Sequence, residues 1–233
     1  DTYIYRMLDN DPDVELDITV QAVPEGLCWV CGSTRSGEEA SLLQAWALLP
    51  PHIEGTLVLV PRHPQRFDEV ADLCLQSGLP WLKYSEIDPH NEGGLGIDSK
   101  FDVYSVSSRR VLLVDSMGLL MHFYRRADVV FVGGSLADTG GHNPLEAAAL
   151  GKPVLMGPNC FNFVQVCDQL EQVQGLRVTS HACLLADITE LLTDQSLREA
   201  MGSAGVALVD AQKGALSRHL VVIEAALNQT LCK

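Results

Sequence analysis

The sequence predicts an α/β protein built on a doubly wound parallel sheet. Seven apolar runs of strand length occur along its 233 residues, and they alternate with longer segments of helical periodicity. The short runs are continuously apolar, which is typical of strands buried on both faces. Strands that alternate with helices in this way predict parallel pairing with right-handed crossovers, so that helices cover both faces of the sheet.

The predicted elements follow one another along most of the chain. The strands are 27–33, 56–61, 80–85, 110–115, 128–134, 153–158 and 175–180. The helices between them, which can place apolar residues at i, i+3, i+4 and i+7, are 36–49, 64–78, 118–127, 143–151 and 161–174. The C-terminal third is mostly helical, from 184–194 through 220–231. Residues 86–109 begin with Gly, Pro, Asn and Asp, so we predict a surface loop followed by one edge strand.

The net charge of the chain limits the kinds of molecule that it is expected to bind. The formal net charge is -14, with 16 Lys and Arg against 30 Asp and Glu. A nucleic-acid-binding surface needs clustered Lys and Arg, so we expect no nucleic-acid partner. A small anionic ligand is compatible with this charge, because a few local donors can hold a phosphate.

The ends of the sequence shape the expected domain organisation. No run of 18 apolar residues occurs, so we expect no membrane-spanning helix and a soluble chain. The first residues lack the pattern of a signal peptide, and there is no initiator Met. We therefore predict that residues 1–26 are a connector from a missing N-terminal domain and that residues 27–233 form one domain.

The seven cysteines are expected to be free thiols in a reducing compartment, because their number is odd and their spacing irregular. Cys28 and Cys31 form a C-x-x-C pair, but they lie in a predicted strand, where such positions face opposite sides. We interpret them as core thiols. No second pair completes a zinc site, and the seven histidines show no metal-ligand spacing, so no metal cofactor is expected.

Ligands of doubly wound sheets bind outside the carboxyl ends of the strands. Five segments with Gly, polar or charged residues follow predicted strands and would meet at this rim. They are 32–39 (GSTRSGEE), 61–66 (PRHPQR), 115–118 (DSMG), 133–146 (GGSLADTGGHNPLE) and 157–163 (GPNCFNF). Their convergence predicts the ligand site.

The segment 133–146 indicates a sugar nucleotide as ligand. Two glycine pairs, Gly133–Gly134 and Gly140–Gly141, allow a close backbone approach beside a helix start, which favours a phosphate. A carboxylate one turn into the helix, Glu146, is placed to accept hydrogen bonds from ribose hydroxyls. The alternative is structural, with Asn143 as N-cap and Glu146 completing a capping box. That alternative leaves His142 and the glycine pairs unexplained.

The other rim segments offer further candidates, each with a structural alternative. Ser33, Thr34 and Gly37 can present hydroxyl and N–H groups, and Arg35 is either a ligand contact or a solvated cation. Ser36 with Glu39 also fits a capping box.

Two more rim segments carry a cation and an apolar edge. Arg62 lies in a proline-fixed loop and suits a phosphate or carboxylate, whereas His63 is either a contact or a support. Met117 and Gly118 would present backbone and an apolar edge to a base. Asp115 and Ser116 are interpreted as helix caps.

Five motifs, taken in order, resemble a known family. They are STRSGEE, LVPRHPQRF, DSMGLL, FVGGSLADTGGHNPLEAAALGKPVLMGP and NFVQVCDQL, and the resemblance to the 3-deoxy-D-manno-octulosonic acid (Kdo) transferases runs from about Leu27 to about Leu231. It implies a Rossmann-like domain, the C-terminal, donor-binding half of a GT-B glycosyltransferase. It also implies inverting, metal-independent transfer of Kdo from CMP-Kdo to a lipid A precursor, at the cytoplasmic face of the bacterial inner membrane.

The resemblance assigns roles residue by residue. Arg62, Met117, Gly118, His142, Asn143 and Glu146 would hold the CMP moiety, and Ser33, Thr34 and Gly37 would face the sugar. The complete predicted set is Ser33, Thr34, Gly37, Arg62, His63, Met117, Gly118, Gly133, Gly134, Ser135, Gly141, His142, Asn143 and Glu146.

The chain departs from the family pattern in three places. Arg35 stands where the family often has His, and Leu119 stands where an acidic residue is common. The N-terminal half, which carries the membrane anchor, the acceptor surface and the catalytic carboxylate in the family, is missing. The chain alone is therefore expected to bind CMP and to transfer nothing.

Three alternatives stay open from the sequence. The first is another GT-B transferase or a sugar-nucleotide epimerase that uses a UDP-sugar. The second is a non-catalytic module that binds sugar nucleotides, and the third is a scaffold without a ligand.

Overall fold

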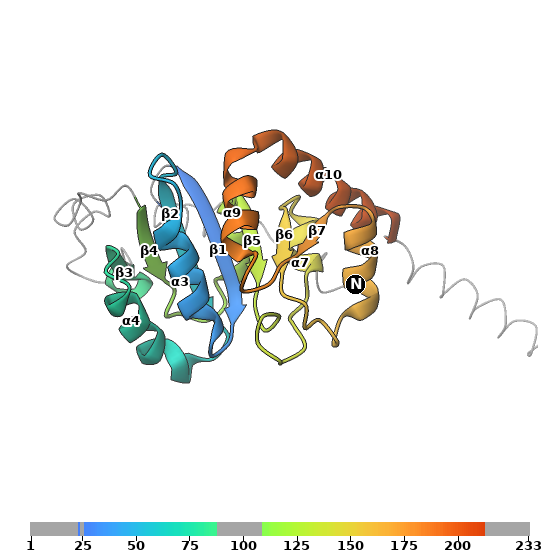
Figure 1. Cartoon of the computed structure of the whole chain (residues 1–233). Helices are drawn as coiled ribbons and strands as arrows, with labels where there is room; N and C mark the ends of the chain where they lie inside the picture. The colour runs from blue at the N-terminus through green and yellow to red at the C-terminus, as the bar shows by residue number, and fades with distance from the viewer. Residues whose placement is uncertain (1–22, 24–25, 88–108, 213–233) are drawn as a thin grey trace, which may run out of the picture.

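The computed structural model describes residues 23, 26–87 and 109–212. Seven strands form one sheet in the order β3-β4-β2-β1-β5-β6-β7, and every pairing is parallel (Figure 1). The strands are β1 (Leu27–Thr34), β2 (Gly55–Pro61), β3 (Trp81–Lys83), β4 (Arg109–Leu113), β5 (Val129–Val132), β6 (Val154–Met156) and β7 (Leu176–Val178). This confirms the predicted fold class and all seven predicted strands.

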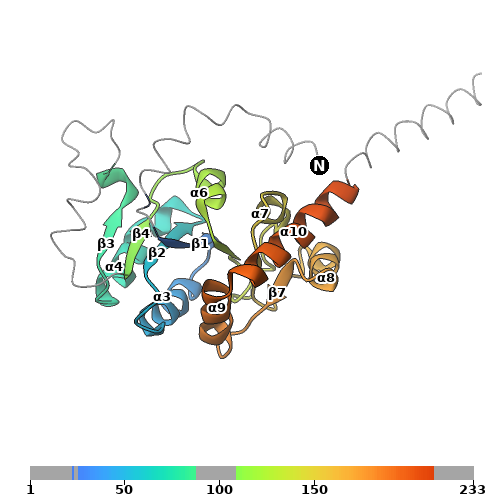
Figure 2. The same ribbon diagram turned by 90° about the horizontal axis from the view of Figure 1, so that it is seen from above.

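Helices cover both faces of the sheet, as Figure 2 shows from above. They are α3 (Glu38–Leu48), α4 (Phe67–Gln76), α6 (Leu120–Arg126), α7 (Leu145–Ala149), α8 (Val164–Gln172), α9 (Leu184–Thr193) and α10 (Gln195–Gln212), with short 3-10 turns η1 (Pro64–Arg66) and η2 (Tyr84–Glu86). Two core clusters mark the two faces, one under α3, α4 and α9 and the other under α6, α7 and α8. Helix α10 contributes to both, since Met201 packs in the first cluster and Val209 in the second.

Successive side chains of β1 point to opposite faces of the sheet, so its two cysteines lie in different core clusters. Cys28 packs with the α6–α8 side and Cys31 with the α3–α9 side, and both are fully buried. Burial raises the pKa of the Cys28 thiol to about 12. The prediction that the C-x-x-C pair is structural is confirmed, and the cysteines in the described ranges are all free thiols.

The strand order contains a topological switch point. The chain builds β2 and β4 outward on one side of β1, and then β5 pairs with the other side of β1. The loops that follow β1 and β5 therefore leave the sheet side by side and diverge to opposite faces. Crevices of this kind are where open α/β sheets bind ligands.

Some predictions fall on residues outside the described part of the chain. These are the connector, apart from Val23 and Gly26, the loop and edge strand between 88 and 108, and the helix 220–231. Within the described residues, every helix is too short or too polar to cross a bilayer.

Gly202 tests the packing of α10 on the end of α7. A Cβ at this position would lie 2.0 Å from the carbonyl oxygen of Gly151. Helix propensity alone predicts that Gly202→Ala stabilises the protein by about 1 kcal/mol. We expect the clash to dominate, so that the free energy of unfolding falls by about 2 kcal/mol in urea denaturation. The exposed neighbour Ser203→Ala is the control, and a stabilised Gly202→Ala variant would refute this packing.

Candidate functional site

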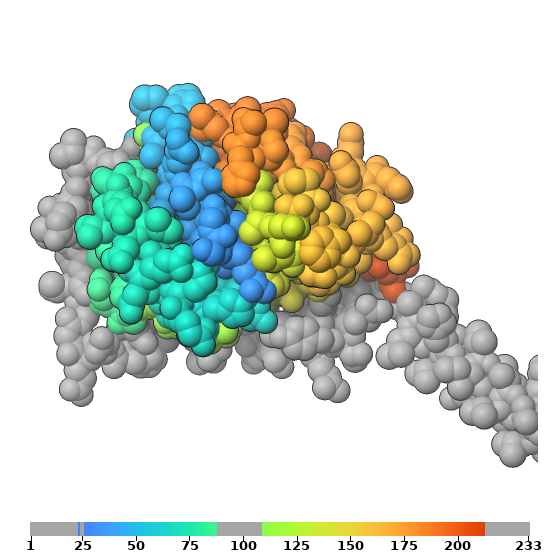
Figure 3. Space-filling view, turned by 60° about the horizontal axis from the view of Figure 1, so that its bottom comes forward, coloured from blue at the N-terminus to red at the C-terminus, as the bar shows by residue number. Residues whose placement is uncertain are grey.

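The rim of the sheet at the switch point carries the candidate site. Figure 3 turns this rim toward the viewer, with the chain after β1 (blue) between the chain after β2 (blue-green) and the loop after β5 (yellow-green). The close approach requires bare backbone at Gly133, where a Cβ would lie 2.5 Å from the carbonyl oxygen of Ser33. Gly133 therefore serves the contact between the end of β1 and the loop after β5.

A buried carboxylate joins these loops. Glu38, in the first turn of α3, is fully buried and accepts backbone hydrogen bonds from residues 134–137 at 2.8–3.3 Å. It also accepts the N–H of Arg35 at 2.8 Å. Five N–H donors thus surround one side chain, which is the arrangement of an anion hole filled by the chain itself.

The glycine pairs of the loop after β5 are predicted to let a phosphate approach, but the N–H groups of Gly133, Gly134 and Gly141 are already bonded within the protein. The N–H of Gly134 is held by Glu38, and the N–H of Gly133 donates to the carbonyl of Gly32 at 2.8 Å. Ser135 is fully buried, and its hydroxyl donates to the carbonyl of Val132 and accepts the N–H of Gly157. Gly141 donates its N–H to Gly134 at 2.7 Å. These residues shape the loop, and their polar groups are already bonded.

A cavity of about 360 Å³ opens beside this loop. It is lined by Ser33, Val60, Pro61, Arg62, Ser116, Met117, Gly118, Leu120, Met121, His142, Asn143, Glu146 and Phe163. Seven predicted residues are among them: Ser33, Arg62, Met117, Gly118, His142, Asn143 and Glu146. Of the remaining seven, Thr34 is fully buried outside the cavity lining, Gly37 is the exposed N-cap of α3, and His63 lies next to Arg35.

The structure also adds cavity residues that the sequence reasoning missed. Phe163 lies in the predicted rim segment 157–163, but it is not among the predicted site residues, and its side chain lines the cavity. Ser116 was interpreted as a helix cap, yet α6 begins after Leu119 without a side-chain cap. Asp115 does not cap α6 either, because its carboxylate binds the N–H and hydroxyl of Ser85.

Glu146 is not part of a capping box. Helix α7 begins at Leu145, and Asn143 Oδ1 accepts the N–H of Leu145 at 3.1 Å, whereas the Glu146 carboxylate has no hydrogen bond or ion pair within the described residues. Burial raises the pKa of its carboxyl, while Arg62 acts in the opposite direction. An unpaired, half-buried acceptor therefore faces the cavity.

The two arginines after β2 have different roles. Arg66 binds the buried Glu39 through two hydrogen bonds of 2.7 and 3.0 Å and also pairs with Glu69. This corrects the capping box predicted for Ser36 and Glu39, since Glu39 is used by Arg66. Arg62 is exposed, and its guanidinium forms no ion pair or hydrogen bond in the part of the chain that the structure describes. Arg62 is thus the cation available at the cavity wall.

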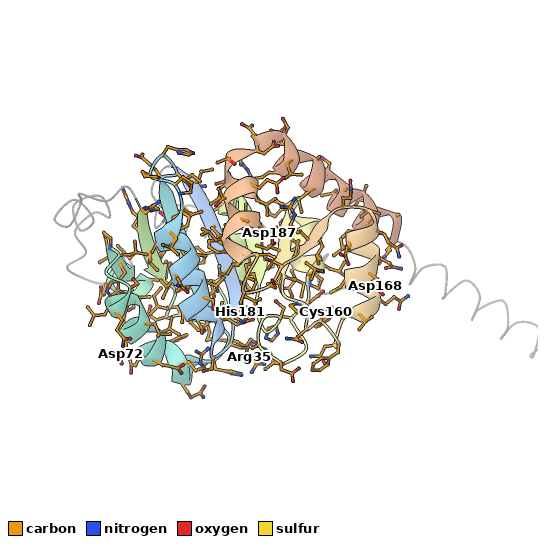
Figure 4. All side chains as sticks on the ribbon, in the orientation of Figure 1. Arg35, Asp72, Cys160, Asp168, His181 and Asp187 are labelled. Carbon is orange, nitrogen blue, oxygen red and sulfur yellow. The ribbon has the colours of Figure 1, made fainter. Side chains whose placement is uncertain are left out.

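A second cationic group lies at the far side of His142. Arg35 donates from Nε to His142 Nε2 at 3.3 Å and bonds from Nη1 to His63 Nε2 at 2.6 Å; Figure 4 shows Arg35 at this edge of the molecule. A guanidinium cannot accept a hydrogen bond, so both Nε2 atoms must carry a lone pair. Burial, followed by the charges of Arg35 and Arg62, lowers the pKa of His142 to about 4.

Among the described residues, His, Cys, Asp and Glu do not gather in any group of three that could hold a metal ion. Metal-independent chemistry stays a prediction.

Replacing Glu38 by Gln should lower the free energy of unfolding by about 3 kcal/mol or more. The single oxygen of an amide cannot accept hydrogen bonds from all five N–H groups, and the buried NH2 group of Gln would find no acceptor. Urea denaturation measures the loss, and hydrogen exchange of residues 134–137 should accelerate. Glu171→Gln, on the exposed side of α8, is the matched control and should be neutral. Equal stability of the two variants would contradict the anchoring role.

The histidine in the cavity wall should titrate near pH 4 rather than near its ordinary value of 6.5. Because the folded state disfavours the proton, His142 contributes stability above about pH 6.5 that is lost as the pH falls toward 4. NMR titration of the His142 ring measures the midpoint, and Arg35→Gln should raise it. A midpoint that is the same in Arg35→Gln as in wild type would contradict the proximity of Arg35.

Comparison with known proteins agrees with this geometry. Residues 109–207 match the family model of glycosyl transferases group 1. The chain is 38% identical over 206 residues to the 3-deoxy-D-manno-octulosonic acid transferase of Haemophilus influenzae, covering 87% of this chain and 45% of that protein. It is 37% identical over 197 residues to the enzyme of the same name from Bordetella pertussis, covering 82% and 43%. The chain thus spans less than half the length of these relatives.

Solved structures show the same fold. The C-terminal CMP-Kdo binding domain of WaaA from Acinetobacter baumannii matches with a TM-score of 0.65 and 26% identity, over 89% of this chain and 98% of that one. The glycosyltransferase WaaG matches over 88% of this chain and 49% of that one, with a TM-score of 0.51 and 16% identity, which shows the fold alone. By sequence, the chain is a homologue of the 3-deoxy-D-manno-octulosonic acid transferases over most of its own length, and by fold it corresponds to the C-terminal domain of a GT-B glycosyltransferase.

Proposed function

We propose that this chain is the donor-binding domain of a Kdo transferase and holds CMP-Kdo in the cavity at the switch point. One observation carries the proposal: the cavity presents an unpaired carboxylate, an unpaired guanidinium and an apolar wall within one space of about 360 Å³. These are the three groups that a nucleoside monophosphate needs for its ribose, its phosphate and its base.

The apolar wall suits the base. Met117 is 55% exposed, and Leu120, Met121 and Phe163 continue the surface that it begins. Gly118, next to Met117, is exposed and has no side chain to cover its backbone. A flat base would bury apolar area here and find backbone groups at its edge.

The charged groups suit ribose and phosphate. The Glu146 carboxylate has no partner within the chain's described residues, so it can accept hydrogen bonds from both hydroxyls of a ribose. Arg62 lies on the wall contributed by the loop after β2, and Ser33 offers a hydroxyl from the end of β1. A phosphate between them would meet a planar cation and a donor.

The relatives support the choice of ligand. Two of them are named 3-deoxy-D-manno-octulosonic acid transferases, and the solved domain is described as CMP-Kdo binding. We propose that the whole protein transfers Kdo to a lipid A precursor at the cytoplasmic face of the inner membrane. In that reaction the bond from the anomeric carbon to the phosphate oxygen breaks, and the guanidinium of Arg62 would stabilise the charge that develops on the departing CMP.

Titration calorimetry with CMP tests the proposal. The wild-type chain should bind CMP and bind UMP at least about tenfold more weakly. Glu146→Ala should weaken CMP binding by about tenfold or more, because two hydrogen bonds to a charged acceptor are lost. The matched control is Glu171→Ala, an exposed carboxylate on α8 remote from the cavity walls.

Three outcomes would count against it. Preference for UMP would move the chain to the UDP-sugar users. Absence of binding for both nucleotides would contradict a donor site in this chain. CMP affinity that is unchanged in Glu146→Ala would remove the carboxylate from the ribose site.

A further inference from the structure

Arg35 is a charged group that the nucleotide site proposed above does not use. Its side chain extends from the loop after β1 and lies between two imidazoles, those of His63 and His142. His142 lines the cavity, whereas Arg35 and His63 are absent from its wall. The guanidinium therefore lies just beyond the nucleotide cavity, on the other side of His142.

The position of Arg35 is held at both ends. Its backbone N–H donates to Glu38 at 2.8 Å, and Nε and Nη1 of its guanidinium contact the two imidazole nitrogens at 3.3 and 2.6 Å. Both imidazoles act as neutral acceptors, since their Nε2 atoms face a group that only donates. Little rotamer freedom is left to lose when a ligand binds, which favours a specific contact over a solvated surface cation.

The charge of Arg35 is not neutralised by the residues around it. Glu38 is occupied by five backbone donors, and Glu39 and Glu69 are paired with Arg66. Arg35 has no ion pair within the described part of the chain. Its remaining N–H groups on Nη1 and Nη2 form a planar fork, which matches a carboxylate through two parallel hydrogen bonds.

The order of the charged side chains along the rim determines which part of the donor reaches the guanidinium of Arg35. If the nucleotide places its ribose at Glu146 and its phosphate at Arg62, the sugar continues past His142 toward Arg35. An ulosonic acid carries its carboxylate on the anomeric carbon, the atom that bears the phosphate oxygen. Carboxylate and phosphate are thus close neighbours in the donor. In the protein, Arg35 is hydrogen-bonded to His142, and His142 lines the same cavity as Arg62.

We propose that Arg35 is a specificity-determining residue that binds the carboxylate of the donor sugar, and that His63 and His142 are positioning residues for it. The inference rests on the proposed donor site, and it names the part of the ligand that this subsite recognises. It predicts selection for sugar acids over neutral sugars on the same nucleotide.

Calorimetric titration with CMP and with freshly prepared CMP-Kdo separates the two proposals. The wild-type chain should bind CMP-Kdo about tenfold more tightly than CMP. In Arg35→Gln this preference should disappear, while the affinity for CMP stays within about threefold. Arg35→Lys keeps the charge but not the fork, so it should retain only part of the preference.

Lys83→Gln is the matched control, because it removes one cation whose partner, Asp68, is exposed. It should leave both affinities unchanged. Retained CMP binding in Arg35→Gln shows that the site is folded. If Arg35→Gln lowers the affinities for CMP and CMP-Kdo equally, or leaves both unchanged, the inference is wrong while the donor site stands. If the wild-type chain does not bind CMP, the proposed function itself fails.

Discussion

The hydrogen bonding of Glu38 is the constraint on which the site depends. Its buried carboxylate accepts one N–H from the loop after β1 and four from the loop after β5, where Gly134 lies 96 residues from Glu38 in the sequence. The carboxylate thus ties the chain after β1 to the chain after β5. A buried charge of this kind is tolerated only when fully hydrogen-bonded. Glu38 accepts the backbone N–H groups of both Gly134 and Arg35. It therefore fixes the loop that leads to His142 and also the residue whose guanidinium contacts His142.

The charged side chains of the rim fall into two groups, those that are bonded within the protein and those that are not. Glu38, Glu39, Arg66 and Glu69 satisfy one another or the backbone, and they hold the loops in place. Arg62, Arg35 and Glu146 have no opposite charge bonded to them within the described chain. A rim with two free cations, one free carboxylate and an apolar wall is complementary to a phosphate, a second anion and hydroxyl groups, which are the parts of an acidic sugar nucleotide.

The fold places these groups through its strand order. Since β5 pairs with β1 after β2 and β4 have extended the sheet on the other side, the loops after β1, β2 and β5 end beside one another. Glycine at position 133 lets them approach to backbone contact. The same sheet matches the C-terminal domain of WaaA.

The sequence by itself determined the sheet, its seven strands and the rim where ligands bind, because continuous apolar runs and helical spacing are local patterns. It also placed Cys28 and Cys31 on opposite faces, which follows from the pleat of one strand. Only the tertiary structure decided which polar groups are occupied. The sequence leaves Glu146 with two roles, a ribose ligand or part of a capping box, and the structure excludes the capping box. The sequence also places a phosphate beside Gly133 and Gly134, but the N–H of Gly134 is bonded to Glu38. Such pairings join residues about 100 positions apart, and competition among partners in space, rather than local spacing, selects them.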